Sequence, residues 1–479
     1  MAVTARTRAM FDELLATRHV PLFRSSAALT VNTGVNALLG FAYWVAAARL
    51  YPEVAVGSGA AAISALQLGA GIGWTGFQYT LMRYLPQAGR LSRLLVLGSY
   101  ASGMLIALPA GLAIIAYAGL SGQMSVIADG VPAALLFLLG IAGWVVFSLE
   151  DAALIGLRRS AWVPLENGAY GLLKLVILVA LASTASALGL LLSWALGALC
   201  LIVVVNALLF VRVLQAPRAP GDLPAVPELA RFTLGHHAAA LVALLPDWIA
   251  PLLVIDLVSR QANAYYYAAW TVAFSLRLVF VNIANALIVE GARRERSFAG
   301  LLRLAFLLGG VVLVPIIVVT LVAARPILSV FGHHYAAGAG VLELFAIGLV
   351  PFSLLNLFVA RERVIERVIP AFAAMSVSTI VTIAADVALL PRIGIEGAGV
   401  GWGVGQVAGL VIAGVSLAFA VPRGRRRAAV RDATGRPRQF PAPLHREPRA
   451  PAVGLANDAL HRDRQEARDV AGVSGGRPE

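Results

Sequence analysis

The sequence predicts an all-α, polytopic membrane protein with about twelve transmembrane helices in two six-helix bundles. Three observations carry this prediction. Long apolar stretches fill residues 25–420, the arginines between them collect in every second gap, and several landmarks recur at a nearly constant distance along the chain. The first observation gives the helices, the second their orientation and the third their grouping into bundles.

Each apolar stretch is long enough to cross a bilayer as a helix, because a span needs roughly 20 apolar residues. The chain is 59% hydrophobic and only 13% charged, whereas charged residues make up roughly a quarter of a soluble globular protein. The composition therefore excludes a soluble domain. The expected spans are 25–48, 55–78, 94–118, 131–154, 163–184, 187–211, 233–256, 263–289, 300–323, 338–360, 368–390 and 396–420.

Arginines give the orientation of these spans, because basic residues collect in cytoplasmic loops. The segment before the first span and every second gap after it are rich in arginine, whereas the gaps between hold one basic residue or none. Both ends of the chain are therefore expected on the cytoplasmic side of the cell membrane. In chain order the rich segments contain Arg6, Arg8, Arg18 and Arg24; Arg83, Arg90 and Arg93; Arg158 and Arg159; Arg212, Arg218 and Arg231; Arg293, Arg294, Arg296 and Arg303; Arg361, Arg363 and Arg367.

Charge and cysteine content exclude several other classes of protein. The net charge of +13 does not indicate nucleic-acid binding, because the excess lies in loops and tail, where it serves topology and attraction to anionic lipids. The single cysteine, Cys200, falls inside the sixth span, so no disulfide framework or paired-cysteine metal site is expected. His333 and His334 are adjacent without further ligands and predict no metal. No P-loop motif appears, so direct coupling to ATP is not expected. No cofactor is expected either.

Three segments lie outside the expected spans. In residues 1–24, Met10, Phe11, Leu14 and Leu15 share one helical side among arginines, which indicates an amphipathic helix on the inner leaflet, although a disordered basic leader fits the same residues. Residues 212–232 are expected to be a cytoplasmic linker between a bundle at 25–211 and another at 233–420. Residues 421–479 are rich in Arg, Pro, Gly and Asp and predict a disordered, basic cytoplasmic tail.

An internal repeat groups the spans into two halves. Pro109 and Pro315 are 206 residues apart, as are Pro164 and Pro370, and a Gly/Ala pattern in the second span returns in the eighth at an offset of 207. A repeat of six spans is even, so both copies start on the same side of the membrane. Their pseudo-two-fold axis should therefore run along the membrane normal.

Charges in the middle of spans mark the candidate site, because each costs about 2.5–3.5 kcal/mol to insert. Lys174 is the only lysine in the chain and lies near the middle of the fifth span. Glu166, Tyr170 and Lys174 are spaced i, i+4 and i+8, with Asn167 beside them, so they form one polar stripe. This stripe is expected to face a cavity and not lipid.

Arg277 is the first choice for an anion ligand. It lies mid-depth in the eighth span with Tyr266 and Trp270 on its helical face, and a guanidinium matches phosphate oxygens in two-pronged geometry. Asp247 lies in the seventh span between Pro246 and Pro251, where the helix is expected to be kinked or broken. Two roles for Asp247 stay open: it neutralises Arg277 or Lys174, or it couples transport to a proton or cation.

Other polar residues are secondary candidates. Asn32 and Asn36 are spaced i, i+4 in the first span, where they could bind sugar hydroxyls or hydrogen-bond between helices. Glu150 and Asp151 lie at the cytoplasmic end of the fourth span and are expected to pair with Arg158 and Arg159.

The chain resembles the O-antigen and capsule polysaccharide flippases of the multidrug, oligosaccharidyl-lipid and polysaccharide exporter superfamily. The resemblance covers roughly residues 20–420 as scattered positions and not as one diagnostic motif. The residues that carry it are Gly40, Phe41, Ala48, Arg49, Tyr51, Pro52, Val56 and Gly57; Arg83, Leu85 and Pro86; Asp151 to Arg159 with Asn167 and Lys174; and Phe331, Gly332, Tyr335 and Ala336.

This resemblance implies movement of a polyprenyl-pyrophosphate-linked oligosaccharide from the inner to the outer leaflet, through a central cationic cavity and without catalytic residues. The implied partners are this lipid-linked substrate and the membrane lipids, with polysaccharide polymerase machinery as a further candidate. Applied to this chain, the roles are pyrophosphate binding by Arg277 and Lys174, sugar contacts by Asn32, Asn36 and Trp270, coupling by Asp247 and gating by Arg83.

Alternative functions predict other features. Lipid II flippases of the same superfamily have two more spans and usually a charge soon after the Gly-Phe of the first span, where this chain has Ala42 and Tyr43. That departure argues against lipid II as cargo. A multidrug exporter would use an acid-rich, cation-binding cavity, whereas cations outnumber carboxylates here. A polysaccharide polymerase or ligase should carry a sizeable external loop with acidic, Arg or His residues, and every expected outer loop is short.

Overall fold

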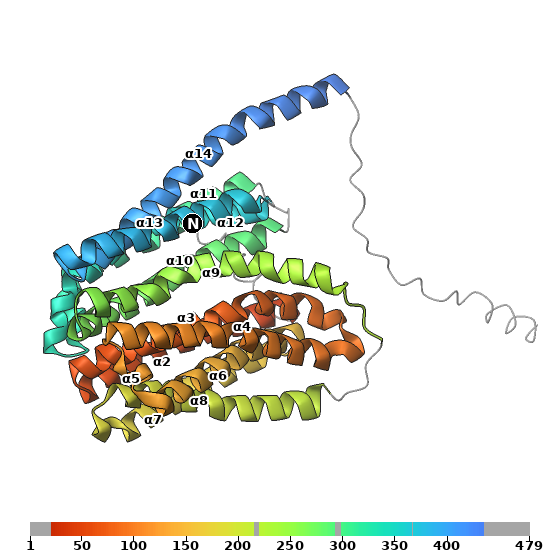
Figure 1. Cartoon of the computed structure of the whole chain (residues 1–479). Coiled ribbons are helices and arrows are strands. Elements are labelled where there is room, and N and C mark those ends of the chain that lie inside the picture. Colours follow the sequence, from red (N-terminus) through yellow and green to blue (C-terminus); the bar gives the residue numbers. More distant parts are fainter. Residues whose placement is uncertain (1–20, 215–219, 293–297, 366, 435–479) are drawn as a thin grey trace, which may run out of the picture. The chain divides into compact units, whose positions relative to one another are not determined.

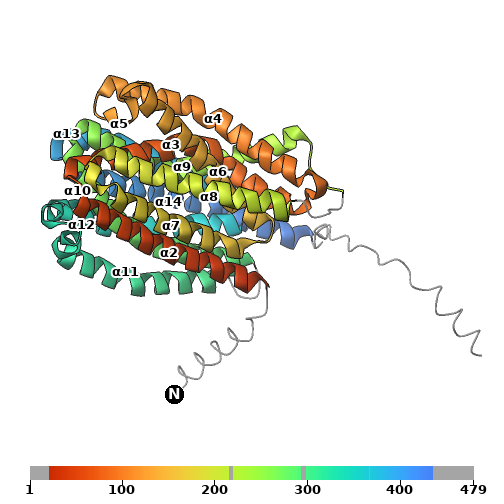
Figure 2. The ribbon, with the colours of Figure 1, turned by 90° about the horizontal axis from the view of Figure 1, so that it is seen from below.

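The computed structural model describes residues 21–214, 220–292, 298–365 and 367–434, and every regular element in these ranges is helical. The long helices run roughly alongside one another (Figure 1 and Figure 2). The expected amphipathic segment in residues 1–20 and the tail beyond Thr434 lie outside the described residues. An all-α polytopic fold is therefore confirmed over the described part of the chain.

Within the described residues, twelve long helices correspond one to one to the expected spans. Eleven of them, all except α2, are long and apolar enough over the described residues to cross a membrane. Their bounds are α2 Pro21–Leu50, α3 Glu53–Tyr84, α4 Ser92–Ser121, α6 Gly130–Gly156, α7 Val163–Ala180, α8 Ala187–Leu208, α9 Val226–Leu257, α10 Arg260–Ala292, α11 Phe298–Ser329, α12 Ala339–Val364, α13 Val368–Ile393 and α14 Glu396–Thr434. The chain is a multi-pass membrane protein.

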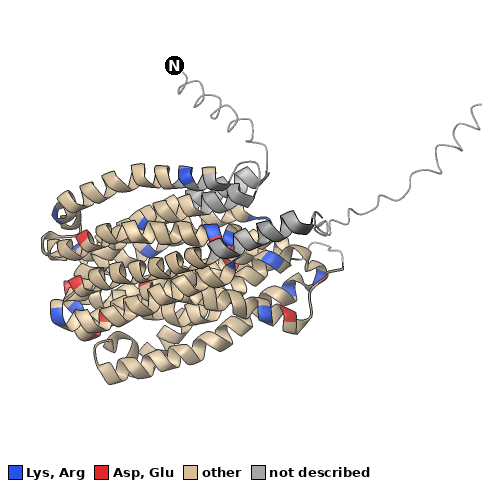
Figure 3. Ribbon diagram, turned by 90° about the horizontal axis from the view of Figure 1, so that it is seen from above, with Lys and Arg blue, Asp and Glu red and all other residues tan. Residues whose placement is uncertain are grey.

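Short elements occupy several connections. They are the one-turn helix α5 Ser125–Ala128, the π-helical turn η6 Leu209–Val213 and the 3-10 turns η2 Leu85–Gln87, η3 Gly89–Leu91, η4 Ser160–Trp162, η5 Ala182–Thr184 and η7 His333–Gly338. Charged residues lie mostly near the ends of the helices, with few along their middles (Figure 3). This distribution is what a helix in hydrocarbon requires, since charge is tolerated at the interfaces and costly between them.

Two helix ends differ from the sequence-based boundaries. α9 begins at Val226, inside the segment 212–232 expected to be a linker. Pro227 in its first turn has a φ suited to a helix start, and Glu228 complements the positive end of the helix dipole. α14 continues to Thr434, beyond the expected end at residue 420, through a stretch rich in Ala and Arg. These residue types favour helix, although the segment is too polar to lie in hydrocarbon.

The expected repeat appears in how the helices pair. In the first half α2 packs on α7, and α3 and α4 both pack on α6; in the second half α9 packs on α13, and α10 and α11 both pack on α12. Each second-half pair is the first-half pair shifted by six spans. The halves, α2 to α8 and α9 to α14 as far as Leu417, occupy separate regions in Figure 1. Up to Leu417 the two halves belong to one compact unit.

α3 forms most of the contact between the halves, through α9 and α10. Over its most apolar stretch 78% of the residues are buried, more than in any other of the eleven candidate spans. Small residues make this possible: a Cβ on Gly57 would lie 1.7 Å from the carbonyl oxygen of Arg260, and one on Gly71 would lie 2.3 Å from the Trp248 ring. Close backbone approach between small residues is a common way to pack helices in lipid.

Candidate functional site

Lys174 lies in a box of aromatic rings. Its side chain is buried on α7, and its Nζ lies 5.0 Å from the ring centre of Tyr43, 4.9 Å from that of Tyr170 and 4.3 Å from that of Trp194. The rings come from α2, α7 and α8. Within the described residues, Lys174 has no ion pair and no hydrogen bond. Contacts with ring faces offset part of the cost of burying the ammonium, but they do not neutralise its charge.

Arg277 is bound to Asp247 by two hydrogen bonds. Nη1 donates to Oδ1 at 2.9 Å and Nη2 donates to Oδ2 at 3.1 Å, which joins α10 to α9. Both side chains are mostly buried, with exposed fractions of 13% and 11%. The guanidinium also lies 4.9 Å from the Trp270 ring and 5.0 Å from the Phe352 ring. The neutralising role of Asp247 is thus present in this structure.

The helix that carries Asp247 is not broken. α9 continues through both Pro246 and Pro251, so of the two expected alternatives, a kink or a break, the break is wrong and the kink stays a prediction. A proline inside a helix removes one backbone hydrogen bond, and in a bundle the neighbouring helices can hold the helix together around that loss.

Three cavities surround these charges. The central cavity, about 440 Å³, lies between the halves and is lined by Lys174 and Asn36 from the first half and by Asp247 and Trp270 from the second. The first-half cavity, about 430 Å³, shares Lys174 and Asn36 with it. The second-half cavity, about 290 Å³, shares Asp247 with it and adds Arg277. Lys174 and the Arg277–Asp247 pair therefore stand at two borders of the central cavity.

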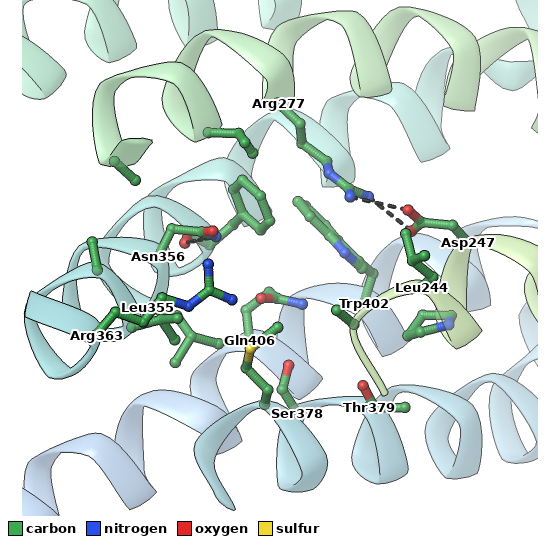
Figure 4. Close-up of a pocket in the computed structure, with 18 residues that line it drawn as sticks. Leu244, Asp247, Arg277, Leu355, Asn356, Arg363, Ser378, Thr379, Trp402 and Gln406 are labelled. Carbon is green, nitrogen blue, oxygen red and sulfur yellow. Dashed lines mark hydrogen bonds and ion pairs between the residues drawn. The ribbon is translucent and has the colours of Figure 1, made fainter. Parts of the chain in front are cut away.

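The second-half cavity has charged and polar side chains set in a mostly apolar lining (Figure 4). In that view the Arg277 guanidinium turns to Asp247, whereas the Arg363 guanidinium points into the cavity toward Gln406. Ser378 and Thr379 line the same cavity. Thr379 Oγ1 donates to the carbonyl oxygen of Val242 at 2.6 Å, which ties α13 to α9.

A second cluster of charge lies in the first half, and it corrects one expectation. Glu150 and Asp151 do not pair with Arg158 or Arg159 in the described residues. Instead, Asn206 Nδ2 donates to Glu150, and Asn167 Nδ2 donates to Asp151 at 3.0 and 3.1 Å. Glu150 is fully buried, because its position two turns before the end of α6 faces the bundle interior.

Glu166 belongs to the same cluster. Its side chain is buried, and neither of its carboxyl oxygens has a hydrogen-bond partner among the described residues. The predicted polar stripe therefore divides: Asn167, Tyr170 and Lys174 face the first-half cavity as expected, whereas Glu166 is turned toward Glu150.

Other predicted site residues are placed as follows. Asn36 and Trp270 line the central cavity. The side chain of Asn32 lies outside the described residues. Arg83 lines none of the three cavities; its guanidinium lies 5.0 Å from the ring of Phe232, where α3 meets α9. Its predicted gating role stays a prediction.

Sequence reasoning missed several groups at these cavities. Tyr43, Trp194 and Gln406 come from helices remote in sequence from Lys174 and Arg277, and no local spacing links them. Arg363 was read only as a cytoplasmic arginine. For Trp194 the sequence signal was ambiguous, since an aromatic residue inside a very apolar span fits a cavity wall as well as lipid.

At the ends of the helices opposite the arginine-rich gaps, polar contacts join the two halves. Glu53 of α3 accepts hydrogen bonds from Tyr265 of α10 at 2.5 Å and from His334 of η7 at 2.7 Å. Arg49 donates to the carbonyl oxygens of Ser329 and Val330, at 3.1 and 3.0 Å. We call these contacts the end latch, defined by Arg49, Glu53 and their partners.

No family model matches the sequence, and no curated protein matches it. Solved structures do match. The lipid II flippase MurJ in an inward closed conformation is 12% identical, with a TM-score of 0.66 over 81% of this chain and 87% of that one. An inward-facing multidrug resistance MATE family transporter of the MOP superfamily is 14% identical, with a TM-score of 0.57 over 86% of this chain and 100% of that one. A MATE transporter from Vibrio cholerae is 15% identical, with a TM-score of 0.54 over 84% and 97%. The chain therefore has the two-lobed helical fold of these transporters.

Proposed function

We propose that this protein moves a polyprenyl-pyrophosphate-linked oligosaccharide from the inner to the outer leaflet of the cell membrane by alternating access. The observation that carries the proposal is the buried Lys174 ammonium, which faces the central cavity with no carboxylate partner among the described residues. A cation held at this depth is expensive and indicates a functional site. An anionic substrate would supply the missing negative charge.

The substrate needs such a site, because a pyrophosphate and several sugars cannot cross hydrocarbon unaided. Lys174 would bind phosphate oxygens as a point charge. Arg277 would bind them in two-pronged fashion, which requires that the phosphate displace Asp247 from the guanidinium. In the empty state Asp247 would return to Arg277, so that this guanidinium is not left without a counter-charge.

Other walls of the central cavity suit the remaining parts of the substrate. Trp44, Tyr267, Trp270 and Phe274 line it with aromatic rings, and Asn36 adds an amide. Rings can contact the apolar faces of sugars, while amides and hydroxyls bind their polar edges. The polyprenyl chain would remain in lipid beside the protein, since there it is already out of water.

We propose that the arginine-rich ends of the helices face the cytoplasm, so that both ends of the chain do too. The end latch would then close the outer side, and its release would accompany opening to the outer leaflet. Because the cell interior is negative, moving negative charge outward gains about 2.3 kcal/mol per charge per 100 mV. Asp247 protonation is an additional coupling step that would free Arg277 for the phosphate.

The test is flipping of a fluorescent polyprenyl-pyrophosphate oligosaccharide in proteoliposomes. Wild type is compared with Lys174→Ala and Arg277→Ala at matched protein levels. Arg325→Ala is the control, because Arg325 is an exposed arginine that lines none of the three cavities. We expect transport by wild type and control and loss of transport in both site variants. Absence of wild-type transport with several such lipids would overturn the proposal.

A multidrug exporter is the second candidate. One observation favours it: Asp247 lies in the same cavity as seven aromatic residues, a combination that also suits an aromatic cation. The unpaired Lys174 ammonium opposes it, because that charge repels a cationic drug. Transport of ethidium driven by a proton or sodium gradient, retained in Lys174→Ala and lost in Asp247→Asn, would select this candidate.

A further inference from the structure

We propose that Arg363 forms a separate binding subsite for a phosphoryl anion in the second-half cavity, together with Gln406 and Ser378. The subsite rests on the proposed function in one respect: it would hold the phosphate of the substrate before or after Arg277 does. Its ligand chemistry, a phosphate or pyrophosphate group, could come from a lipid headgroup or from a free anion.

The arginines around Arg363 show why it is available. Glu362 is fully buried and forms ion pairs with Arg361 and Arg367. The distance from Arg367 Nε to Glu362 Oε2 is 3.4 Å. Two of the three arginines in this connection are therefore engaged by one carboxylate. Arg363 has no ion pair or hydrogen bond within the described residues, and it points into the cavity (Figure 4).

The cavity gives this guanidinium suitable companions. Gln406 is buried on α14, Ser378 is buried on α13, and both line the cavity. Neither the Gln406 amide nor the Ser378 hydroxyl has a hydrogen-bond partner among the described residues, so both can donate to a ligand. Buried polar groups without partners in the protein are usually satisfied by water or by a ligand. Three donors of different kinds thus face one space.

The charge of the cavity selects an anion. Its charged lining residues are Arg277, Arg363 and Asp247, and the two-pronged pair of Arg277 with Asp247 cancels within the wall. One positive charge is left, on Arg363. A volume of about 290 Å³ accommodates a phosphate or pyrophosphate and not a sugar chain in addition. Guanidinium geometry favours phosphate oxygens over a spherical anion such as chloride.

The position of Arg363 in the cavity indicates the order in which a phosphate would meet the two arginines. Arg363 lies in the last turn of α12, at the arginine-rich end of the helices, and Arg277 lies deeper in the same cavity. A phosphate leaving Arg363 would therefore meet Arg277 next, and Asp247 connects that cavity to the central one. In the alternative, Arg363 binds no ligand: it contributes only to membrane orientation as a cytoplasmic arginine and complements the negative end of the α12 dipole.

Equilibrium binding separates these readings. Radiolabelled inorganic pyrophosphate is titrated against purified full-length protein in detergent, and polyprenyl phosphate is titrated against the same protein in nanodiscs. The variants are Arg363→Gln, Arg363→Lys and a matched control, Arg231→Gln. Arg231 is an exposed arginine of α9 at the arginine-rich end of the helices, and it lines none of the three cavities.

For Arg363→Gln we expect binding weakened about tenfold or more, as for a lost charged hydrogen bond. Arg363→Lys should bind with intermediate strength and the control should match wild type. If Arg363→Gln binds inorganic pyrophosphate more weakly than wild type does, a free anion is a sufficient ligand. If only the binding of polyprenyl phosphate is weakened, the ligand is a lipid headgroup. Both results support the subsite. Unchanged binding of both probes in a monodisperse Arg363→Gln, or no binding by wild type, overturns it.

The proposed function and the subsite can fail separately. Wild-type flipping with Arg363-independent binding would remove the subsite and keep the flippase. Arg363-dependent binding without flipping of any lipid-linked sugar would keep the subsite and remove the function.

Discussion

The guanidinium of Arg277 on α10 and the carboxylate of Asp247 on α9 are joined by hydrogen bonds of 2.9 and 3.1 Å, at the border between two cavities. The pair makes each charge tolerable at this depth, since the coulombic attraction offsets part of the desolvation penalty. It also means that the Arg277 guanidinium is occupied when no substrate is bound. Any ligand for Arg277 must therefore compete with Asp247.

The first prediction concerns this pair. Arg277→Gln and Asp247→Asn should each lower the free energy of unfolding, by about 3 kcal/mol if the site behaves as other buried pairs do, because each leaves a partner charge uncompensated. The double variant should lose clearly less than the sum of the two. Thermal unfolding of the three proteins in detergent measures this. Additive losses would mean that the two charges are stabilised independently.

The second prediction uses the same pair to test competition. Asp247→Asn removes the carboxylate that a phosphate must displace, so pyrophosphate should bind more tightly to this variant than to wild type. Outward transport should nevertheless fall, because the carboxylate no longer helps the phosphate to leave. The measurement combines equilibrium binding with flipping in proteoliposomes. Weaker binding in Asp247→Asn would contradict a competing role.

The third prediction separates charge from packing at Lys174. Lys174→Met keeps an unbranched apolar chain inside the ring box of Tyr43, Tyr170 and Trp194 but removes the ammonium. It should fold as stably as wild type or more so, because replacing a buried unpaired charge removes a desolvation penalty. Transport should be lost. Lys174→Arg keeps the charge in a larger head group and should retain part of the activity.

Melting temperature and flipping rate are measured on the same preparations of the Lys174 variants. Full transport by a stable Lys174→Met would show that the ammonium does not touch the substrate.

Much of this architecture follows from local signals in the sequence. Hydropathy and arginine placement depend on neighbouring residues only, so all twelve expected spans have a helix in the structure. Contacts along one helix were also predictable: Trp270 lies beneath Arg277 at a spacing of seven residues, and Tyr170 lies four residues before Lys174. Such pairs share a face by helical geometry alone.

Contacts between helices were not predictable in the same way. Asp247 had two possible cations as partners, and only packing shows that it binds Arg277. Glu150 was expected to pair with Arg158, eight residues on. The chain instead leaves α6 after Gly156 and turns at Arg158, whose φ is 59°, so that this arginine is exposed while Glu150 stays inside and meets Asn206. A turn that reverses the chain cannot be read from charge spacing.

The fourth prediction tests how α14 packs on α13. A Cβ on Gly405 would lie 1.9 Å from Thr382 Oγ1 and 2.6 Å from the carbonyl oxygen of Ser378, whereas a Cβ on Gly403 would meet nothing within 4 Å. Gly405→Ala should therefore lower stability by about 1–3 kcal/mol, the usual cost of overpacking. Gly403→Ala, on the same helix, should be neutral or gain up to about 1 kcal/mol. Equal melting temperatures for the two variants would contradict this packing.

The last prediction concerns the end latch. Glu53→Gln weakens the hydrogen bonds from Tyr265 and His334, and Arg49→Gln removes the two bonds to carbonyl oxygens of Ser329 and Val330. Because these contacts join α2 and α3 to the second half, their loss should shift the population toward a state that is open at this end. The free-energy difference between the closed and open states should fall by the contact free energy lost. The double variant should shift it furthest.

Spin labels on Val54→Cys and Val258→Cys, in a Cys200→Ser background, report this opening. Both positions are partly exposed at the latch end, one in each half, at 48% and 37%. Wild type should give mainly the short distance of the closed state, and the latch variants should add a longer one. Arg325→Gln is the matched control, since Arg325 has the same charge near the same end and takes part in no latch contact. An unchanged distance distribution in the double latch variant would mean that apolar packing along α3 closes this end without help from the charged pairs. The substitution to test next would then be Gly57→Ala, because its Cβ would push α3 away from Arg260.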